Sequence, residues 1–158
     1  MDIANISNPN GSNHNSPTRL IIHSMGEFIN DNGNAYHAHE WLSHIGLSAH
    51  YLICPSGVVI KCRDTDTGAY HAKGNNSHTV GIEILVKGVH TYDTFKEAIK
   101  TEYVTSEQFN ALLEISKAVI DHWNISIDDV VRHSDIDPER KVDPGEGFDF
   151  EMFRRLLI

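Results

Sequence analysis

Short apolar runs separated by polar loops mark the expected strands of this chain. The run Leu20–Ile22 has no polar position, as in strands that are buried on both faces of a sheet. Two other runs flank Pro55–Gly57, where proline fixes φ and glycine supplies the left-handed residue of a hairpin turn. We predict strands at residues 19–23, 48–54, 58–63, 79–86 and 129–132.

Helical spacing of apolar positions is clearest after residue 105. Thr105 and Gln108 form the sequence signature of a capping box, with Thr105 as N-cap and Gln108 three residues later. The helix is predicted to run to about Trp123 with an apolar face toward the core. Shorter helices are predicted at residues 36–45 and 149–158, with one helical turn within 94–99.

Strands that alternate with helices indicate an α/β protein, and the hairpin requires the sheet to be mixed. We therefore predict a single domain with a central mixed β-sheet of about five strands flanked by helices. Residues 1–18 are rich in Asn and Ser and are expected to be an irregular, partly mobile lead-in to a domain at 19–158. Loops are expected at Met25–Asn34 and, as a longer excursion, at Gly88–Val104.

Composition narrows the function classes. The 158 residues include 13 basic and 22 acidic side chains, for a net charge of -9, which argues against nucleic-acid partners. No apolar run is long enough for membrane insertion, and the N-terminus lacks the basic flank and apolar stretch of a secretory signal. Cys54 and Cys62 are expected to be free thiols. We expect a monomer.

Eleven histidines invite a search for metal ligands. His23 and His133 each follow an apolar strand, so the two imidazoles would converge if those strands are neighbours. Asp143 lies ten positions after His133, in a proline-bounded loop that can fold back. Two histidines, an aspartate and a water make an open zinc site. As isolated residues, the same side chains would be ordinary surface groups.

Glu83 and Lys141 are the candidate catalytic residues. Glu83 interrupts a β-branched strand, where a buried carboxylate is costly without a partner; if it lies near a metal, it can transfer protons. Lys141 precedes Asp143 by two residues and can stabilise an oxyanion. The alternatives are a solvated carboxylate on an edge strand and a surface lysine.

Six motifs bring these residues together in a known order. The chain resembles the type 2 family of zinc N-acetylmuramoyl-L-alanine amidases, which includes phage amidase lysozymes and peptidoglycan recognition proteins. The resemblance covers nearly all of residues 19–157. It rests on motifs at residues 20–23, 48–53, 70–72, 80–84, 132–136 and 141–145.

The resemblance implies one zinc ion held by His23, His133 and Asp143, with Glu83 and Lys141 as the catalytic pair. It implies that residues 19–158 are an amidase catalytic domain. The implied reaction is hydrolysis of the amide between N-acetylmuramic acid and L-alanine, so the implied partner is peptidoglycan or a muropeptide.

The resemblance also implies substrate contact at His71 and Asn76, while His50 is expected to be a core or supporting residue. Asp143 replaces the cysteine of phage lysozymes, and Ala49 stands where those enzymes have a catalytic tyrosine. Both departures are more similar to bacterial recycling and lipoprotein amidases. The excursion at 88–104 is expected to border the substrate groove.

Several biological roles fit this sequence. The principal hypothesis is a bacteriolytic phage or prophage endolysin, made in the cytoplasm and reaching the cell wall through a holin or another carrier. One alternative is a cytoplasmic amidase that recycles anhydro-muropeptides. Others are a non-catalytic peptidoglycan-binding module and a hydrolase acting on a different amide.

Overall fold

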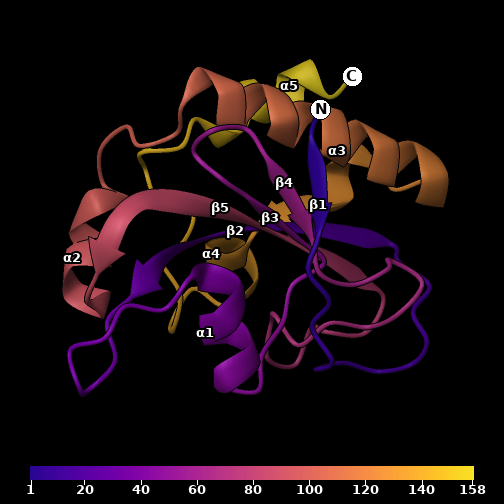
Figure 1. The fold of residues 1–158 in the computed structure, drawn as a ribbon. Helices are drawn as coiled ribbons and strands as arrows, with labels where there is room; N and C mark the ends of the chain where they lie inside the picture. Colours follow the sequence, from indigo (N-terminus) through magenta and orange to yellow (C-terminus); the bar gives the residue numbers. More distant parts are fainter.

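The structure is a computed structural model that describes residues 1–158, and it has a mixed six-stranded sheet with helices on both faces (Figure 1). The strands are β1 (Ile3–Asn5), β2 (Arg19–Phe28), β3 (Tyr51–Ile53), β4 (Val59–Lys61), β5 (Thr79–His90) and β6 (Val130–Arg132). The helices are α1 (Ala38–His44), α2 (Tyr92–Ala98), α3 (Ser106–Trp123), α4 (His133–Ile136) and α5 (Phe150–Leu156), with a 3-10 turn at Ile127–Asp129.

The strand order is β1-β4-β3-β5-β2-β6. The β3–β4 hairpin is the antiparallel pair, and the other neighbours run parallel. The predicted α/β fold with a mixed sheet is therefore confirmed. Strands β2 and β6 are neighbours, as the convergence of His23 and His133 requires, and Ile22 pairs with Arg132.

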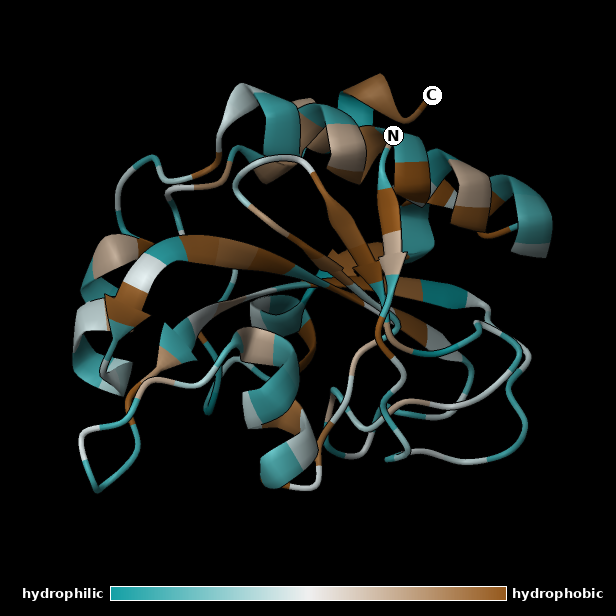
Figure 2. Cartoon of the chain, in the orientation of Figure 1, coloured by the Kyte–Doolittle hydropathy of each residue, from teal (hydrophilic) through white to brown (hydrophobic).

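Alternation along β5 divides the interior into two layers. Val80, Ile82 and Ile84 face α3 and α5 in the larger apolar core, whereas Glu83 and Leu85 face the layer that contains α1. Figure 1 shows α3 and α5 above the sheet and α1 below it, and Figure 2 shows the apolar strands between these layers. The main apolar core thus covers the face of the sheet toward α3 and α5, and Glu83 lies on the opposite face.

Helix α3 begins where the sequence predicts it. Thr105 accepts a hydrogen bond from the Gln108 backbone N–H, and the Gln108 side chain accepts one from the Thr105 N–H. The Gln108 amide also donates to the carbonyls of Ile53 and Leu85, which ties the helix to β3 and β5. The helix ends at Asn124, whose left-handed conformation (φ 54°) is tolerated by asparagine.

The largest differences from the predicted bounds concern three segments. The sheet has six strands where about five were predicted, because Ile3–Asn5, in the lead-in predicted to be irregular, pairs with β4 as an edge strand. The loop expected from Met25 begins later, since β2 continues to Phe28. Strand β5 likewise continues to His90, inside the expected excursion. The extensions of β2 and β5 pair with each other across a bulge, so each supports the other.

The segment that follows β1 is tied to the domain by side-chain hydrogen bonds. The Arg63 guanidinium donates to the carbonyl oxygens of Asn8, Ser12 and Gly68. The buried Asn15 amide donates to the Thr79 carbonyl at 2.8 Å. Residues 6–18 thus lack helix and strand but are anchored at several points.

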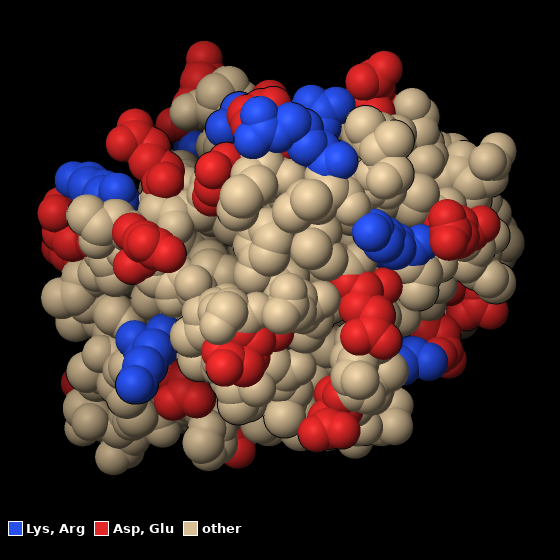
Figure 3. All heavy atoms as spheres, turned by 90° about the horizontal axis from the view of Figure 1, so that it is seen from above, with Lys and Arg blue, Asp and Glu red and all other residues tan.

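The surface over α3 and α5 carries both signs of charge, interspersed rather than gathered into one basic field (Figure 3). This distribution agrees with the acidic net charge of -9 and gives no support for a phosphate-binding face there. None of the helices is long and apolar enough to cross a bilayer.

Candidate metal centre and its cleft

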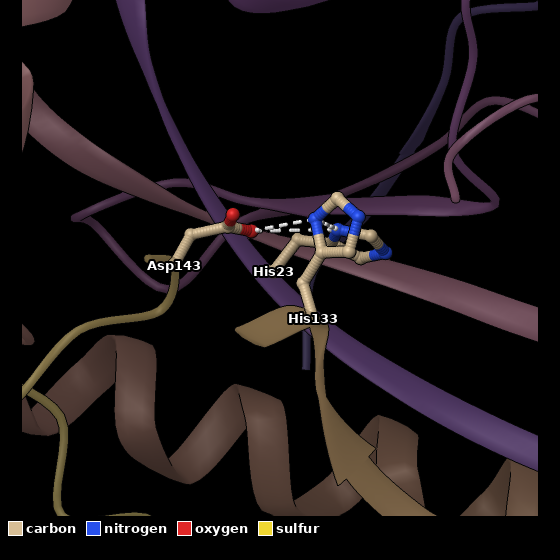
Figure 4. A group of neighbouring side chains, drawn as sticks. All are labelled: His23, His133 and Asp143. Carbon is tan, nitrogen blue, oxygen red and sulfur yellow. Dashed lines mark hydrogen bonds and ion pairs between the residues drawn. The ribbon is translucent and has the colours of Figure 1, made fainter. Parts of the chain in front are cut away.

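His23, His133 and Asp143 meet at one point (Figure 4). The Nδ1 atoms of the two histidines are 2.9 Å apart, and Asp143 Oδ2 lies 3.2 Å from His133 Nδ1 and 3.4 Å from His23 Nδ1. All three side chains are buried, with 1%, 4% and 7% of their surface exposed. The three predicted ligands are therefore brought together, although the two histidines lie 110 positions apart.

Two parallel strands and one loop place these ligands. His23 lies in the middle of β2, not at its end as expected, because the strand is longer than predicted. His133 follows β6 directly and begins α4. Asp143 is held by the Ser24 N–H, which donates to Oδ2, and by its own carbonyl, which accepts from the Ser134 N–H.

The electrostatics of the cluster favour an anionic Asp143 beside a neutral His23. Burial alone would raise the pKa of Asp143, but the neighbouring His133 and His23 hold that pKa well below its usual range. Burial lowers the pKa of His23. The His133 Nε2 atom is buried and has no hydrogen-bond partner. A neutral imidazole and a carboxylate are the protonation states in which these groups bind metals.

Glu83 lies beside the same cluster. It pairs in register with His23 across β2 and β5, and its Oε1 is 3.9 Å from His23 Nδ1. The side chain is 7% exposed, and Oε2 has no hydrogen-bond partner. Burial, together with the charge of Asp143, raises the pKa of Glu83 well above its usual value, while Lys141 opposes this shift. A carboxyl group with a raised pKa holds a proton more readily, as a group that gives and takes protons requires.

Two further residues singled out in the sequence lie near the cluster. His71 Nδ1 is 2.8 Å from His23 Nε2, and its other ring nitrogen is bonded to Thr79. The Asn76 side-chain oxygen accepts from the backbone N–H groups of His71 and Ala72. The geometry thus gives both residues internal contacts, and their expected substrate contacts stay predictions.

His50 is a core histidine rather than a ligand. It is fully buried; Nδ1 accepts from the Gly81 N–H, and Nε2 lies 2.8 Å from the Thr67 carbonyl. Burial lowers the pKa of His50 to about 4. Both ring nitrogens are satisfied in the neutral form, as expected for a supporting residue.

A cavity of about 230 Å³ opens onto the cluster. Its polar end contains the three candidate ligands with Glu83, His71 and Lys141, and its walls are largely apolar and aromatic. The exposed wall residues are Ile45, Leu47, Tyr70 and Tyr92. A second cavity of about 580 Å³ also reaches Lys141 and is lined by α2 on one side. The predicted excursion therefore does border the cleft.

Tyr103 is a contributor that the sequence did not reveal. Its hydroxyl donates to the Pro144 carbonyl at 2.8 Å, next to Asp143, and burial raises its pKa. The residue lies in the segment between α2 and α3, where no periodic pattern or motif distinguishes it. Only the folded chain shows that it supports the loop that carries Asp143.

A buried two-histidine, one-aspartate cluster beside a protonatable glutamate, in a cleft of an α/β sheet, defines a candidate metallohydrolase. Comparison with known proteins identifies the family within this class. Residues 13–146 match the Amidase_2 family model, described as N-acetylmuramoyl-L-alanine amidase. The chain belongs to this family, whose enzymes hydrolyse the amide between N-acetylmuramic acid and L-alanine.

The relatives agree with this assignment. The chain is 29% identical to the 1,6-anhydro-N-acetylmuramyl-L-alanine amidase AmpD of Enterobacter cloacae, over 89% of this chain and 81% of that protein. The corresponding Escherichia coli protein is 28% identical, over 90% of this chain and 83% of the relative.

Solved structures show the same fold. An AmpD crystal structure superposes with a TM-score of 0.75 at 25% identity, covering 100% of this chain and 96% of that one. The N-acetylmuramoyl-L-alanine amidase LysC from Clostridium intestinale also superposes with a TM-score of 0.75, at 22% identity, covering 99% of this chain and 97% of that one. The type 2 amidase fold expected from the motifs is confirmed.

Proposed function

We propose that this amidase is zinc-dependent, with His23, His133 and Asp143 as the metal ligands. The observation that carries the proposal is the mutual distance of the three donor atoms, 2.9 to 3.4 Å. Tetrahedral coordination with bonds of about 2.0–2.2 Å separates ligand atoms by roughly 3.3 Å. The three side chains therefore fit a zinc ion with little movement, and all three line the cleft.

When bound, zinc would supply a Lewis acid that polarises the scissile carbonyl and lowers the pKa of a water molecule. Glu83 would take a proton from the attacking water and deliver it to the departing amine of L-alanine. Its burial and its unpaired Oε2 support this role, because no internal partner occupies that oxygen. Lys141, in the same cavity, would stabilise the charge that develops on the carbonyl oxygen.

We assign catalysis to residues 19–158, since every proposed ligand and catalytic residue lies there. The apolar and aromatic walls of the cleft would hold the substrate, and α2 would form one of those walls. His71 lines the cleft, and the Asn76 side chain holds the His71 backbone, so substrate contact through these two residues is part of the proposal.

The substrate would be polymeric peptidoglycan in a bacteriolytic, endolysin-like role. Recycling of soluble anhydro-muropeptides is the second candidate, favoured by the names of the AmpD relatives. A purely peptidoglycan-binding module is disfavoured, since both members of the catalytic pair accompany the full set of ligands.

Digestion of intact sacculi and of soluble anhydro-muropeptide, each with and without chelator, tests the proposal. Mass analysis should show a new L-alanine amino terminus, and activity should be lost with chelator and restored by zinc. Release from sacculi supports lysis, and turnover of soluble fragments alone supports recycling. Activity that survives full removal of metal would contradict the zinc assignment.

A further inference from the structure

A chain of hydrogen bonds leads from Thr79 to the metal cluster. The Thr79 Oγ1 atom lies 2.9 Å from His71 Nε2, and His71 Nδ1 lies 2.8 Å from His23 Nε2. The three residues are buried, with 4%, 9% and 1% of their surface exposed. Water is therefore a poor substitute for any of these partners.

The available donors and acceptors determine in which direction each of these hydrogen bonds runs. Thr79 has one hydroxyl proton, which it donates to the carbonyls of Asn75 and Asn76, at 2.9 and 3.2 Å. Its oxygen must then accept from His71 Nε2–H. A neutral His71 with that proton carries a lone pair on Nδ1, so Nδ1 accepts from His23 Nε2–H. The lone pair of His23 is consequently on Nδ1, the atom that faces His133 and Asp143.

Neighbouring residues hold His71 in the position from which it contacts His23. A Cβ atom on Gly81 would lie 2.4 Å from His71 Nδ1 and 2.5 Å from its Cγ, so the ring packs directly on the glycine backbone. The His71 N–H is held by the Asn76 side chain at 3.0 Å. The Gly81 backbone therefore packs against the His71 ring, and the Asn76 side chain fixes the His71 backbone.

We propose that His71, supported by Thr79, is a positioning residue that fixes His23 in the Nε2–H tautomer and so presents Nδ1 to the metal ion. The proposal rests on the proposed zinc site for its purpose, but the tautomer itself is a property of the metal-free protein. An outer hydrogen bond of this kind typically contributes 10- to 100-fold in metal affinity. Loss of the acceptor on His71 should weaken zinc binding by about that factor.

Nitrogen-15 NMR of the metal-free protein tests the tautomer directly. Two-bond proton–nitrogen correlations distinguish Nε2–H from Nδ1–H imidazoles, and a His23→Gln variant assigns the His23 signals. We expect His23 as Nε2–H in the unmodified chain and in Thr79→Ser. In Thr79→Val and His71→Phe we expect a mixture of tautomers.

Zinc affinity, measured by competition with a chromophoric chelator, is the second readout. His71→Phe should bind zinc 10- to 100-fold more weakly, on the order expected for an outer hydrogen bond. His71→Asn should recover part of the loss, since its Oδ1 lies near the position of the lost Nδ1 acceptor. His37→Phe, at an exposed histidine, is the matched control and should bind zinc as the unmodified chain does.

A His23 that is Nδ1–H in the unmodified protein, or a His71→Phe variant with unchanged tautomer and zinc affinity, would overturn the proposal. If His71→Phe does not fold, the Thr79→Val and Thr79→Ser pair decides the question. If the unmodified chain shows the Nε2–H tautomer yet does not bind zinc, the metal assignment fails while the positioning of His23 stands.

Discussion

His23 and Glu83 lie opposite each other on neighbouring parallel strands, with His23 Nδ1 and Glu83 Oε1 3.9 Å apart. In-register residues of adjacent strands point to the same face of a sheet. This pairing therefore places the proposed proton-transfer group beside a proposed metal ligand, on rigid backbone. Two strands, rather than a mobile loop, determine their separation.

Because Glu83 and His133 have separate proposed roles, their mutation should affect zinc content and turnover differently. Glu83→Ala should keep one zinc per chain but lower kcat/KM by about 10²- to 10⁴-fold, the usual contribution of a general acid–base group. His133→Ala should lose both metal and turnover. Metal analysis and chromatographic assay of released peptide measure the two effects, with Glu83→Gln as a control of similar shape. Near-normal turnover in Glu83→Ala would remove the proton-transfer assignment.

Tyr92 tests whether α2 is a wall of the substrate cleft. Tyr92 is half exposed and lines the cavity that opens onto His23, His133 and Asp143. Tyr92→Ala should raise KM about fivefold, equivalent to roughly 1 kcal/mol of lost binding, with little change in kcat. Deletion of Thr91–Ile99 is a poorer test, because Phe95 and Ile99 are buried core residues. An unchanged KM on every muropeptide tested would mean that Tyr92 does not contact substrate.

His50 should make stability depend on pH. The folded pKa of His50 is lowered from 6.5 to about 4, so the unfolded chain binds more protons between these values. The free energy of unfolding should therefore fall as pH decreases from 6.5 toward 4, by roughly 2–3 kcal/mol from this group. His50→Gln cannot titrate and should lose less stability over that window. Parallel slopes of unfolding free energy against pH would contradict the burial of a neutral imidazole.

Arg63 anchors the N-terminal segment to the domain. Arg63→Ala removes the donors to the Asn8, Ser12 and Gly68 carbonyls, which should cost about 1–3 kcal/mol. Urea unfolding should show a lower midpoint at constant m, and amide exchange should accelerate in residues 8–15. The Arg63→Lys variant has a single ammonium group, so its unfolding midpoint should lie between those of Arg63→Ala and the unmodified chain. Unchanged exchange in this segment would mean that other contacts suffice to hold it.

Local signals account for the elements that the sequence predicted best. The capping box at Thr105 and Gln108 and the apolar spacing after it are contained within a few residues, and α3 begins and continues as expected. Strand ends behave differently, since a strand is complete only with its neighbour. The edge strand at Ile3–Asn5 and the extension of β2 to Phe28 depend on partners from distant segments.

The amino-acid sequence by itself determined the α/β class, the order of the main elements and the identity of the five proposed metal-binding and catalytic residues. Their residue types and motifs can be recognised in the sequence without knowledge of the fold. Only the tertiary structure decided that three of them lie within hydrogen-bond reach, that Glu83 is buried with an unpaired oxygen, and that His71 contacts His23. The physical reason is that distance, burial and the direction of a hydrogen bond are properties of pairs of residues. Such pairs are brought together by strand register and loop closure, which no local pattern along the chain specifies.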